Sequence, residues 1–228
     1  MYLSRIELMP GESVRPEVAC SIRDAYGAHQ LLWTLFSDGP DRKRDFLFRV
    51  EAGGTGQTES RFRAWTLSER KPMPAAHGFR VETRTLDPVL AEGDRLHFSV
   101  RVNPTVRHAG DERPNPARHD VVQDAKVRLR QSGGEVPRLS ELVHSEVKGW
   151  LLKREEAGGF QVEQGSLRVD GYRQHRFRRP GGKEVRLSTV EVEGVLVVRE
   201  PEKFLETWRR GLGPAKGFGC GLLMIRRA

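Results

Sequence analysis

The chain has 228 residues, of which 37% are hydrophobic and 31% are charged, and its formal net charge at pH 7 is +8. This balance excludes a disordered chain, because enough apolar side chains are present for real cores, and the length has room for two domains of about 100 residues. A protein this basic usually binds a polyanion, either nucleic acid or an acidic membrane surface.

The first half of the chain is predicted to form strands around one helix. A strand is expected over 2–8. A helical segment follows whose apolar residues recur at three- and four-residue spacing: Val18, Ile22, Ala25, Leu32, Trp33 and Phe36. Pro16 could occupy the first turn of this helix or Asp24 could be its N-cap; Asp24 is favoured because Gly27 then falls in the first turn. Four further strands are expected at 45–52, 61–69, 79–86 and 94–104.

The second half is predicted to repeat this arrangement of a helix beside strands. Residues 105–137 are rich in proline, glycine and charge, so we expect an inter-domain linker with mobile loops there. The elements expected beyond it are a helix from 138, strands at 160–169, 171–179 and 185–198, a helix over 201–210 and a closing strand at 221–225. The chain is therefore predicted to be an α+β protein with two tandem ferredoxin-like (RRM-like) domains, 1–104 and 138–228, each with an antiparallel sheet.

Five glycines fall within eleven residues near the C-terminus: Gly211, Gly213, Gly217, Gly219 and Gly221. Glycine loses more backbone freedom on folding than any other residue, so the cluster needs a structural reason. A helix C-cap and a turn explain one or two glycines but not five, and the glycines of a P-loop precede a helix. Two interpretations are equally open: backbone amides and Lys216 approach an anionic chain, or the backbone packs tightly on another element.

Residues 168–186 are predicted to form a basic β-hairpin. The segment holds seven Lys or Arg residues against two acids, and Pro180 with the two glycines after it forms a good turn. Charge on an edge strand also discourages aggregation, but the dominance of one sign favours phosphate binding. The residues expected to bind phosphate are Arg173, Arg176, Arg178, Arg179 and Lys183.

Tyr26 and His29 lie one helical turn apart, so their side chains can converge on one spot. His29 also lies on the apolar stripe of the predicted helix, and a half-buried, hydrogen-bonded histidine is the commoner fate of such a residue. If Asp24 caps the helix, the pair sits in its first turns, where free amides and the helix dipole attract a phosphate. A histidine there exchanges a proton near neutral pH.

Four stretches together resemble the CasE-type CRISPR endoribonucleases, which mature the guide RNA of type I-E systems: MYLSRIEL, DAYGAHQLLWTLF followed by RDFLFRVE, LHFSVRVNP, and GLGPAKGFGCGLL. The last stretch fits the signature of repeat-RNA-binding proteins, in which two Gly-hydrophobic-Gly triplets are separated by five residues. The resemblance covers both ends and most of the N-terminal half, and is weak over 105–160.

The resemblance implies two tandem ferredoxin-like domains and metal-independent cleavage on the 3′ side of a repeat stem-loop. It also implies that the protein keeps its product as a subunit of the interference complex, often called Cascade. The family's catalytic histidine falls on His29 and its neighbouring tyrosine on Tyr26, and its basic hairpin, which enters the major groove of the stem, corresponds to the segment around 173–183. No cofactor and no metal are expected, and the glycine segment is expected near the RNA.

Two other classes of protein would share part of these features. A tandem RNA-binding module without catalysis would share the folds and the charge, and a structural subunit would use the hairpin to dock a protein. A metal nuclease is disfavoured because no acids or Cys/His have ligand spacing. Cys20 and Cys220 fit neither a disulfide framework nor a zinc site, and no stretch suits a membrane span or a signal peptide, so we expect a cytoplasmic protein with no membrane partner.

Overall fold

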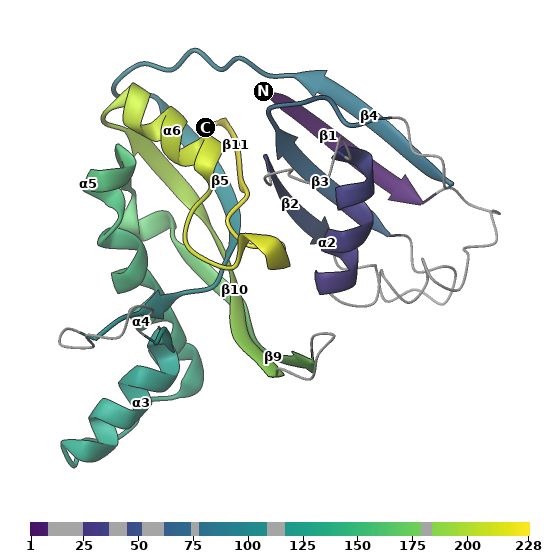
Figure 1. The fold of residues 1–228 in the computed structure, drawn as a ribbon. Coiled ribbons are helices and arrows are strands. Elements are labelled where there is room, and N and C mark those ends of the chain that lie inside the picture. Colours follow the sequence, from purple (N-terminus) through teal and green to yellow (C-terminus); the bar gives the residue numbers. More distant parts are fainter. Residues whose placement is uncertain (9–24, 37–44, 52–61, 74–77, 109–116, 179–183) are drawn as a thin grey trace. The chain divides into compact units, whose positions relative to one another are not determined.

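The computed structural model describes the chain outside residues 9–24, 37–44, 52–61, 74–77, 109–116 and 179–183 (Figure 1). The chain divides into two compact units. The first comprises Met1–Val89 together with 209–211 and 216–222, and the second comprises Leu90–Trp208 together with 212–215 and 223–228. The end of the chain therefore supplies residues to both units.

The first unit is a four-stranded antiparallel sheet with a helix. Its strands follow the order β2-β3-β1-β4, with β1 paired to both β3 and β4. The elements are β1 (Tyr2–Leu8), α2 (Ala25–Trp33), the 3₁₀ helix Thr34–Phe36, β2 (Phe46–Glu51), β3 (Arg63–Ser68) and β4 (Phe79–Thr85). This strand order is that of a ferredoxin-like sheet, in which the first and third strands are central.

The core of the first unit lies between α2 and the sheet. Ala28 and Leu32, four residues apart on α2, are almost completely buried. They pack in one cluster with Ile6 of β1 and Phe46 and Phe48 of β2. The apolar spacing that predicted a helix is thus the stripe that faces the sheet, as expected for an amphipathic helix on one side of a layer.

The second unit holds a sheet of order β11-β5-β10-β8, all antiparallel, with β9 paired to β10 beside this path. Its strands are β5 (Arg95–Val102), β8 (Phe160–Val162), β9 (Arg168–Arg178), β10 (Glu184–Val198) and β11 (Leu223–Arg227). Its helices are α3 (Val121–Gln131), α4 (Leu139–Leu152), α5 (Glu155–Gly158) and α6 (Pro201–Arg210), and a small sheet pairs β6 (Thr105–Val106) with β7 (His119–Asp120).

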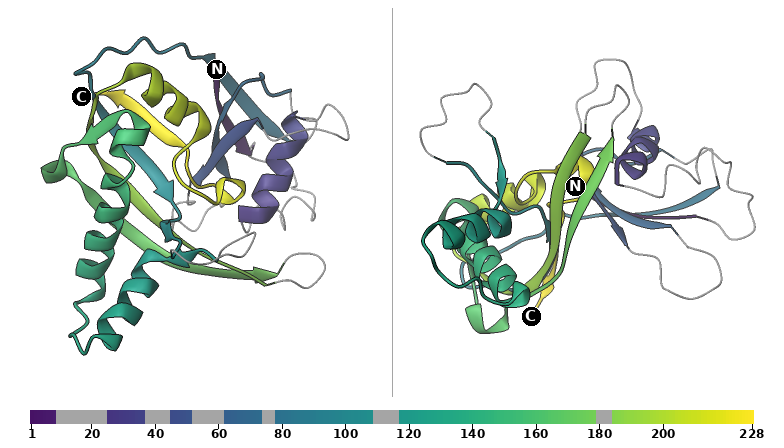
Figure 2. Two further views of the ribbon diagram at one scale, coloured as in Figure 1. Left: turned by 60° about the vertical axis from the view of Figure 1, so that its left-hand side comes forward. Right: turned by 90° about the horizontal axis from the view of Figure 1, so that it is seen from below.

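The second unit is ferredoxin-like with one long hairpin added. The order β5, α4, β8, β10, α6, β11 is a βαββαβ chain, and its sheet again places the first and third strands in the centre. β10 is long enough to pair with β8 near its end and with β9 over its first half. Figure 2 shows β9 and the first half of β10 running beyond the rest of this sheet. The predicted fold class is confirmed.

Most of the predicted elements lie where the sequence pattern put them. The strand at 2–8 and the helix at 201–210 match β1 and α6 in both bounds, and the strand expected at 160–169 is instead the short β8 followed by the 3₁₀ helix Gln164–Ser166. Asp24, Pro16 and Cys20 lie outside the described residues, so the N-cap stays a prediction.

The structure places the domain boundary earlier than the predicted boundary at residue 104. β5 was expected in the N-terminal domain, but it pairs with β10 from Val190 opposite Val102 to Val197 opposite Arg95, and with β11 on its other side. Hydrogen bonding on both edges makes β5 a central strand of the second unit, whose first residue is Leu90. The predicted linker, 105–137, contains β6, β7 and α3 rather than loops alone.

Candidate functional site

His29 lies on α2 among aromatic rings of the first unit. Its imidazole stacks on Phe48 with ring centroids 5.7 Å apart, and meets the edge of Trp33 at 5.2 Å. The centroid of Phe46 lies 6.0 Å away. The Nε2 atom is buried, whereas the side chain as a whole is partly exposed. The ring is therefore oriented by the aromatic side chains of α2 and β2 and still reaches the surface of its unit.

Tyr26 precedes His29 by three residues on the same helix, as predicted. Three-residue spacing places two positions on neighbouring parts of a helix surface. The side chain of Tyr26 lies outside the described part of the chain, so its role stays a prediction.

The glycine segment returns to the first unit and packs against α2 and β2. Lys216–Phe218 forms a 3₁₀ helix that contacts both elements. A Cβ at Gly219 would lie 3.3 Å from the ring of Phe48, and Gly219 has a positive φ of 77°. Because Phe48 is the ring on which His29 stacks, the glycine backbone supports the imidazole through one intervening side chain.

Close packing explains why two further positions are glycine. A Cβ at Gly211 would meet the side chain of Leu47 at 2.8 Å and the carbonyl oxygen of Gly221 at 2.9 Å. In the second unit, a Cβ at Gly213 would lie 2.9 Å from the ring of Trp150. Both glycines have φ near +77°, which disfavours any side chain. These contacts favour tight backbone packing over the alternative that the amides of the segment bind an anionic chain.

The remaining members of the predicted glycine site are Gly217 and Lys216, both in the 3₁₀ helix, and Gly221, which has a positive φ of 91°. Lys216 is partly exposed at the surface of the first unit. Its predicted contact with RNA remains a prediction.

We define the basic ribbon as β9 together with the part of β10 that pairs with it, Glu184–Glu193. Arg173 and Arg176 are exposed on β9, and Arg176 lies directly opposite Arg186 of β10. Arg186 bonds to the carboxylate of Glu184 on its own strand at 2.9 Å. The ribbon belongs to the second unit, whereas His29 belongs to the first.

The other predicted phosphate ligands of the hairpin fall at its tip. Arg178 ends β9, and its side chain lies outside the described residues, as do Arg179 and Lys183. Closer to the base, Nε2 of His175 lies 2.8 Å from the hydroxyl of Thr189. Burial, assisted by the positive charges of Arg101 and Arg173, lowers the pKa of His175.

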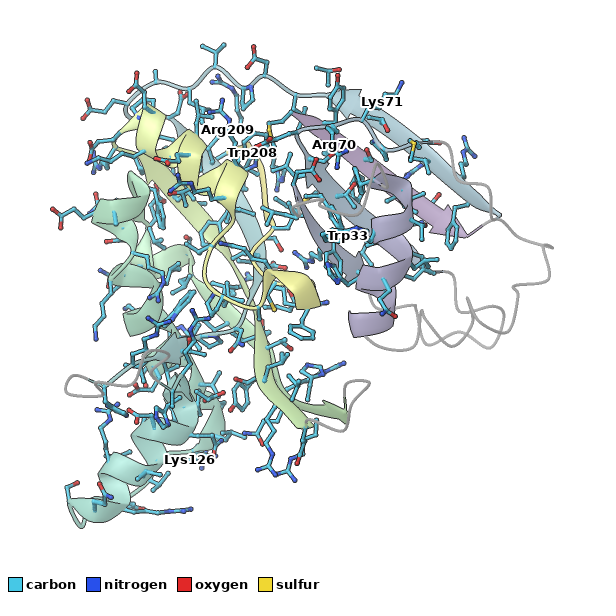
Figure 3. All side chains as sticks on the ribbon, viewed as in Figure 1. Trp33, Arg70, Lys71, Lys126, Trp208 and Arg209 are labelled. Carbon is cyan, nitrogen blue, oxygen red and sulfur yellow. The ribbon has the colours of Figure 1, made fainter. Side chains whose placement is uncertain are left out.

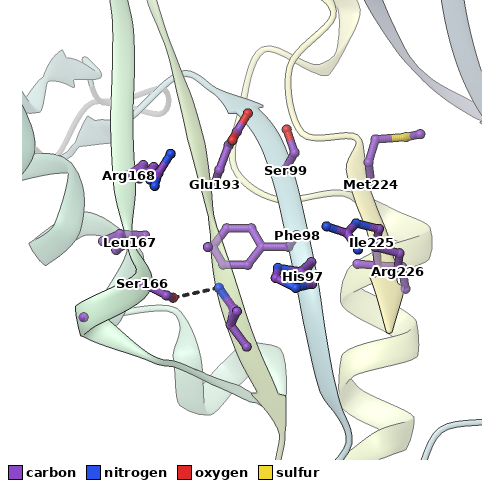
Figure 4. Close-up of a pocket in the computed structure, with 13 residues that line it drawn as sticks. His97, Phe98, Ser99, Ser166, Leu167, Arg168, Glu193, Met224, Ile225 and Arg226 are labelled. Atoms are coloured by element: carbon purple, nitrogen blue, oxygen red, sulfur yellow. Dashed lines mark hydrogen bonds between the residues drawn. The ribbon is translucent and has the colours of Figure 1, made fainter. Parts of the chain in front are cut away.

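A groove on the second unit was not anticipated from the sequence. It has a volume of about 810 Å³ and is lined by β5, β10, β11 and the turn before β9 (Figure 4). Arg168, Glu193 and Arg226 bring charges of both signs to it, and Ser166 accepts the backbone N–H of Val195 at 2.8 Å. Within the described residues, its lining includes none of the predicted site residues.

Two absences hold for the part of the chain that the structure describes. No group of three or more His, Cys, Asp or Glu side chains there is arranged to hold a metal ion. No helix there has both the length and the apolar character needed to cross a bilayer.

Comparison with known proteins decides the family. A family model described as "CRISPR associated protein" matches residues 1–227. The chain is 30% identical to the Cascade subunit CasE of Escherichia coli strain K12 over 229 residues, covering 99% of this chain and 98% of that protein. The chain belongs to the CasE family of CRISPR-associated proteins.

Other relatives agree along the whole length. The CRISPR-associated endoribonuclease Cse3 of Thermus thermophilus is 27% identical, with 99% of each chain covered. A structure of Cse3 bound to a 19-nucleotide RNA matches with a TM-score of 0.74 at 25% identity, covering 99% of this chain and 100% of that one. The crystal structure of Cas6e from E. coli K-12 matches with a TM-score of 0.66 at 27% identity over the full length of both chains. The fold and the CasE family assignment therefore agree from end to end.

Proposed function

We propose that this protein is an endoribonuclease that cuts CRISPR repeat RNA at a stem-loop and then stays on its product within a type I-E interference complex. The observation that carries the proposal is similarity along the whole chain to a protein named as an endoribonuclease, Cse3, and to one named as a Cascade subunit, CasE. One structural relative was solved on an RNA representing a pre-cleavage complex, at 25% identity and a TM-score of 0.73.

The proposed chemistry uses the RNA's own nucleophile. The 2′-hydroxyl beside the scissile phosphate loses its proton to a base and attacks the phosphorus, while the bond to the 5′-oxygen breaks. That oxygen takes a proton, so the products are a 2′,3′-cyclic phosphate and a 5′-hydroxyl, and no metal is needed. The protein has to align the attack, move two protons and stabilise charge on the phosphorane.

His29 is the proposed general acid or general base. The stack on Phe48 and the edge contact with Trp33 restrict its orientation, and a group held in one orientation transfers a proton in a reproducible geometry. Tyr26, one turn earlier, is proposed to orient the ribose or to donate to a phosphate oxygen.

The basic ribbon is the element proposed to bind the RNA stem. A-form RNA hides its base edges in a deep and narrow major groove, so a protein recognises the shape and phosphates of the stem and the nucleotides that flank it. Exposed arginines on a projecting two-stranded ribbon suit the end of a short stem, where that groove opens. Together with Lys216 they would also offset charge that develops on the phosphate.

The experiment is cleavage of an end-labelled repeat hairpin in the presence of EDTA, with end-group analysis of the product. The proposal predicts one cut on the 3′ side of the stem and a 2′,3′-cyclic phosphate end. The matched control is the same RNA with a 2′-deoxyribose at the scissile nucleotide, which should bind and remain uncut. Cleavage only with magnesium would contradict the 2′-hydroxyl route, and binding without any cut would support a non-catalytic RNA-binding module instead.

A further inference from the structure

One carboxylate joins α3 to both strands of the basic ribbon. Oδ1 of Asp120 accepts the backbone N–H groups of Val122 at 2.8 Å and Gln123 at 2.9 Å, and so caps α3. Its other oxygen accepts the hydroxyl of Tyr172 on β9 at 3.0 Å and the hydroxyl of Ser188 on β10. The start of the helix and the base of the ribbon are therefore tied to one side chain.

The Tyr172 hydroxyl extends this network. It donates to Asp120 and accepts from the side-chain amides of Gln123 at 3.3 Å and Gln174 at 3.4 Å. One donated and two accepted bonds use the full capacity of a phenol. Burial raises the pKa of Tyr172, which keeps the phenol protonated and able to donate. A satisfied, half-buried polar network of this kind fixes the orientation of the elements that it joins.

The side of α3 away from its most buried residues is basic. Positions 123, 126, 127 and 130 lie on this side of the helix; 127 and 130 are exposed, whereas 123 and 126 are partly buried. This side carries Lys126, labelled in Figure 3, and Arg130 one turn later, and it begins at Gln123, which bonds to the ribbon. Val127 between them is 51% exposed.

Arg128 on the flank of the same helix provides a contrast. Its guanidinium bonds to Asp124 at 3.0 Å and to Glu146 of α4 at 3.3 Å, so its charge is balanced within the protein. On α3 itself, three basic residues stand against one acidic residue, Asp124, so positive charge is in excess on this helix. Arg176 follows Tyr172 and Gln174 on one face of β9 by two-residue alternation, and Arg186 lies directly opposite it. The carboxylate of Glu184, which bonds to Arg186, offsets one of these two positive charges.

We propose that α3 forms a second wall of the RNA-binding surface, with Lys126 and Arg130 contacting phosphates of the stem that the ribbon grips, and that Asp120 and Tyr172 position the two walls relative to each other. The inference rests on the proposed function. Charge complementarity identifies the partner as an RNA phosphodiester backbone. Lys126 and Arg130 touch only RNA in this account, whereas Asp120 and Tyr172 are positioning residues.

The test measures stem-loop affinity at several salt concentrations with the full chain carrying His29→Ala, so that the RNA stays intact. Lys126→Gln with Arg130→Gln should weaken binding about 10- to 100-fold at 0.1 M salt and lower the slope of log affinity against log salt by about 2, because each phosphate contact contributes roughly 0.9 to that slope. The matched control is Arg199→Gln with Lys203→Gln, two exposed cations of the same unit, which should leave both the affinity and the slope unchanged.

Tyr172→Phe tests the positioning role, since it removes the hydroxyl and keeps the ring. Alone, this substitution should weaken RNA binding several-fold. In a protein that already carries Lys126→Gln and Arg130→Gln, the further loss of affinity should be smaller, because the helix whose position Tyr172 fixes no longer contacts the RNA. Wild-type affinity in the α3 variant, with weakened binding in Arg176→Gln, would overturn this inference and leave the proposed function intact. Failure of the wild-type protein to bind the repeat RNA would instead overturn the proposed function.

Discussion

The glycine segment and the basic ribbon are both unusual in composition, and the structure uses them in opposite ways. Gly211, Gly213 and Gly219 lie against the side chains of Leu47, Trp150 and Phe48, and a Cβ at any of them would crowd its neighbour. The ribbon instead exposes Arg173 and Arg176 to solvent. The glycine cluster therefore leaves room for neighbouring side chains to pack, whereas the arginine cluster brings positive charge to the surface of the second unit.

Among variants that keep His29, reversing the charge of the ribbon should have the largest effect. Glutamate at Arg176, Arg178 and Arg179 should weaken stem-loop binding by at least about 100-fold at 0.1 M salt and flatten its salt dependence, because three phosphate contacts become repulsive. Affinity is measured by titration over a range of salt concentrations.

The control for the ribbon variant reverses three exposed cations of the first unit, Lys71, Arg80 and Arg84, which makes the same change in net charge. Equal losses in the two triple variants would mean that net charge alone drives binding. Unchanged affinity in the ribbon variant would place the RNA path elsewhere.

A smaller effect is expected at Gly211, on stability. Gly211→Ala should lower the free energy of unfolding by about 2–4 kcal/mol, because a Cβ there meets Leu47 and the carbonyl of Gly221 in addition to the strain of a positive φ. Gly93→Ala is the matched control, since Gly93 has φ of 88° and nothing within 4 Å of the added Cβ. That control should cost about 1 kcal/mol. Both variants are measured by denaturant unfolding. If they lost the same free energy of unfolding, the close contacts at Gly211 would contribute nothing beyond backbone strain.

The smallest effect concerns pH. The pKa of His175 is lowered in the folded protein, so the unfolded chain binds more protons at mildly acidic pH. The stability linked to this group is therefore fully present above its ordinary pKa of ~6.5 and is lost as pH falls below that value. The denaturant midpoint of the wild type should be higher at pH 7.5 than at pH 5.5. This difference between the two midpoints should be smaller in His175→Gln. An unchanged difference between the two midpoints would exclude His175 as the source.

Local pattern predicted the elements well and their partners poorly. Two-residue alternation identifies 94–104 as a strand, and the same alternation is compatible with either sheet, because it records which face is buried and not which strand lies alongside. The register of β5 with β10 joins residues 88 to 102 positions apart in the sequence, from Val102 with Val190 to Arg95 with Val197. That pairing decides the boundary at Val89 and Leu90, and no short stretch contains it.

The linker interpretation of 105–137 missed α3 for a related reason. Its buried apolar residues, Val121, Val122 and Ala125, lie near the start of the helix, and Val127 farther along is exposed, so the periodic signal is weak. A capping signal was nevertheless present, since Asp120 stands three residues before Gln123, the spacing of a capping box. His29 was predicted from its helical position and from family resemblance. The aromatic setting of His29 was not predicted, because it requires β2 to lie beneath α2.

The most direct test of the account is the single-turnover cleavage rate of His29→Ala on a repeat hairpin, measured at saturating protein together with affinity for the uncut RNA. Loss of one acid–base group typically costs a factor of ~10² to 10⁴, so the rate should fall by that factor while affinity stays within about twofold of the wild type. Cleavage at the wild-type rate would contradict the assignment of His29 to the chemistry.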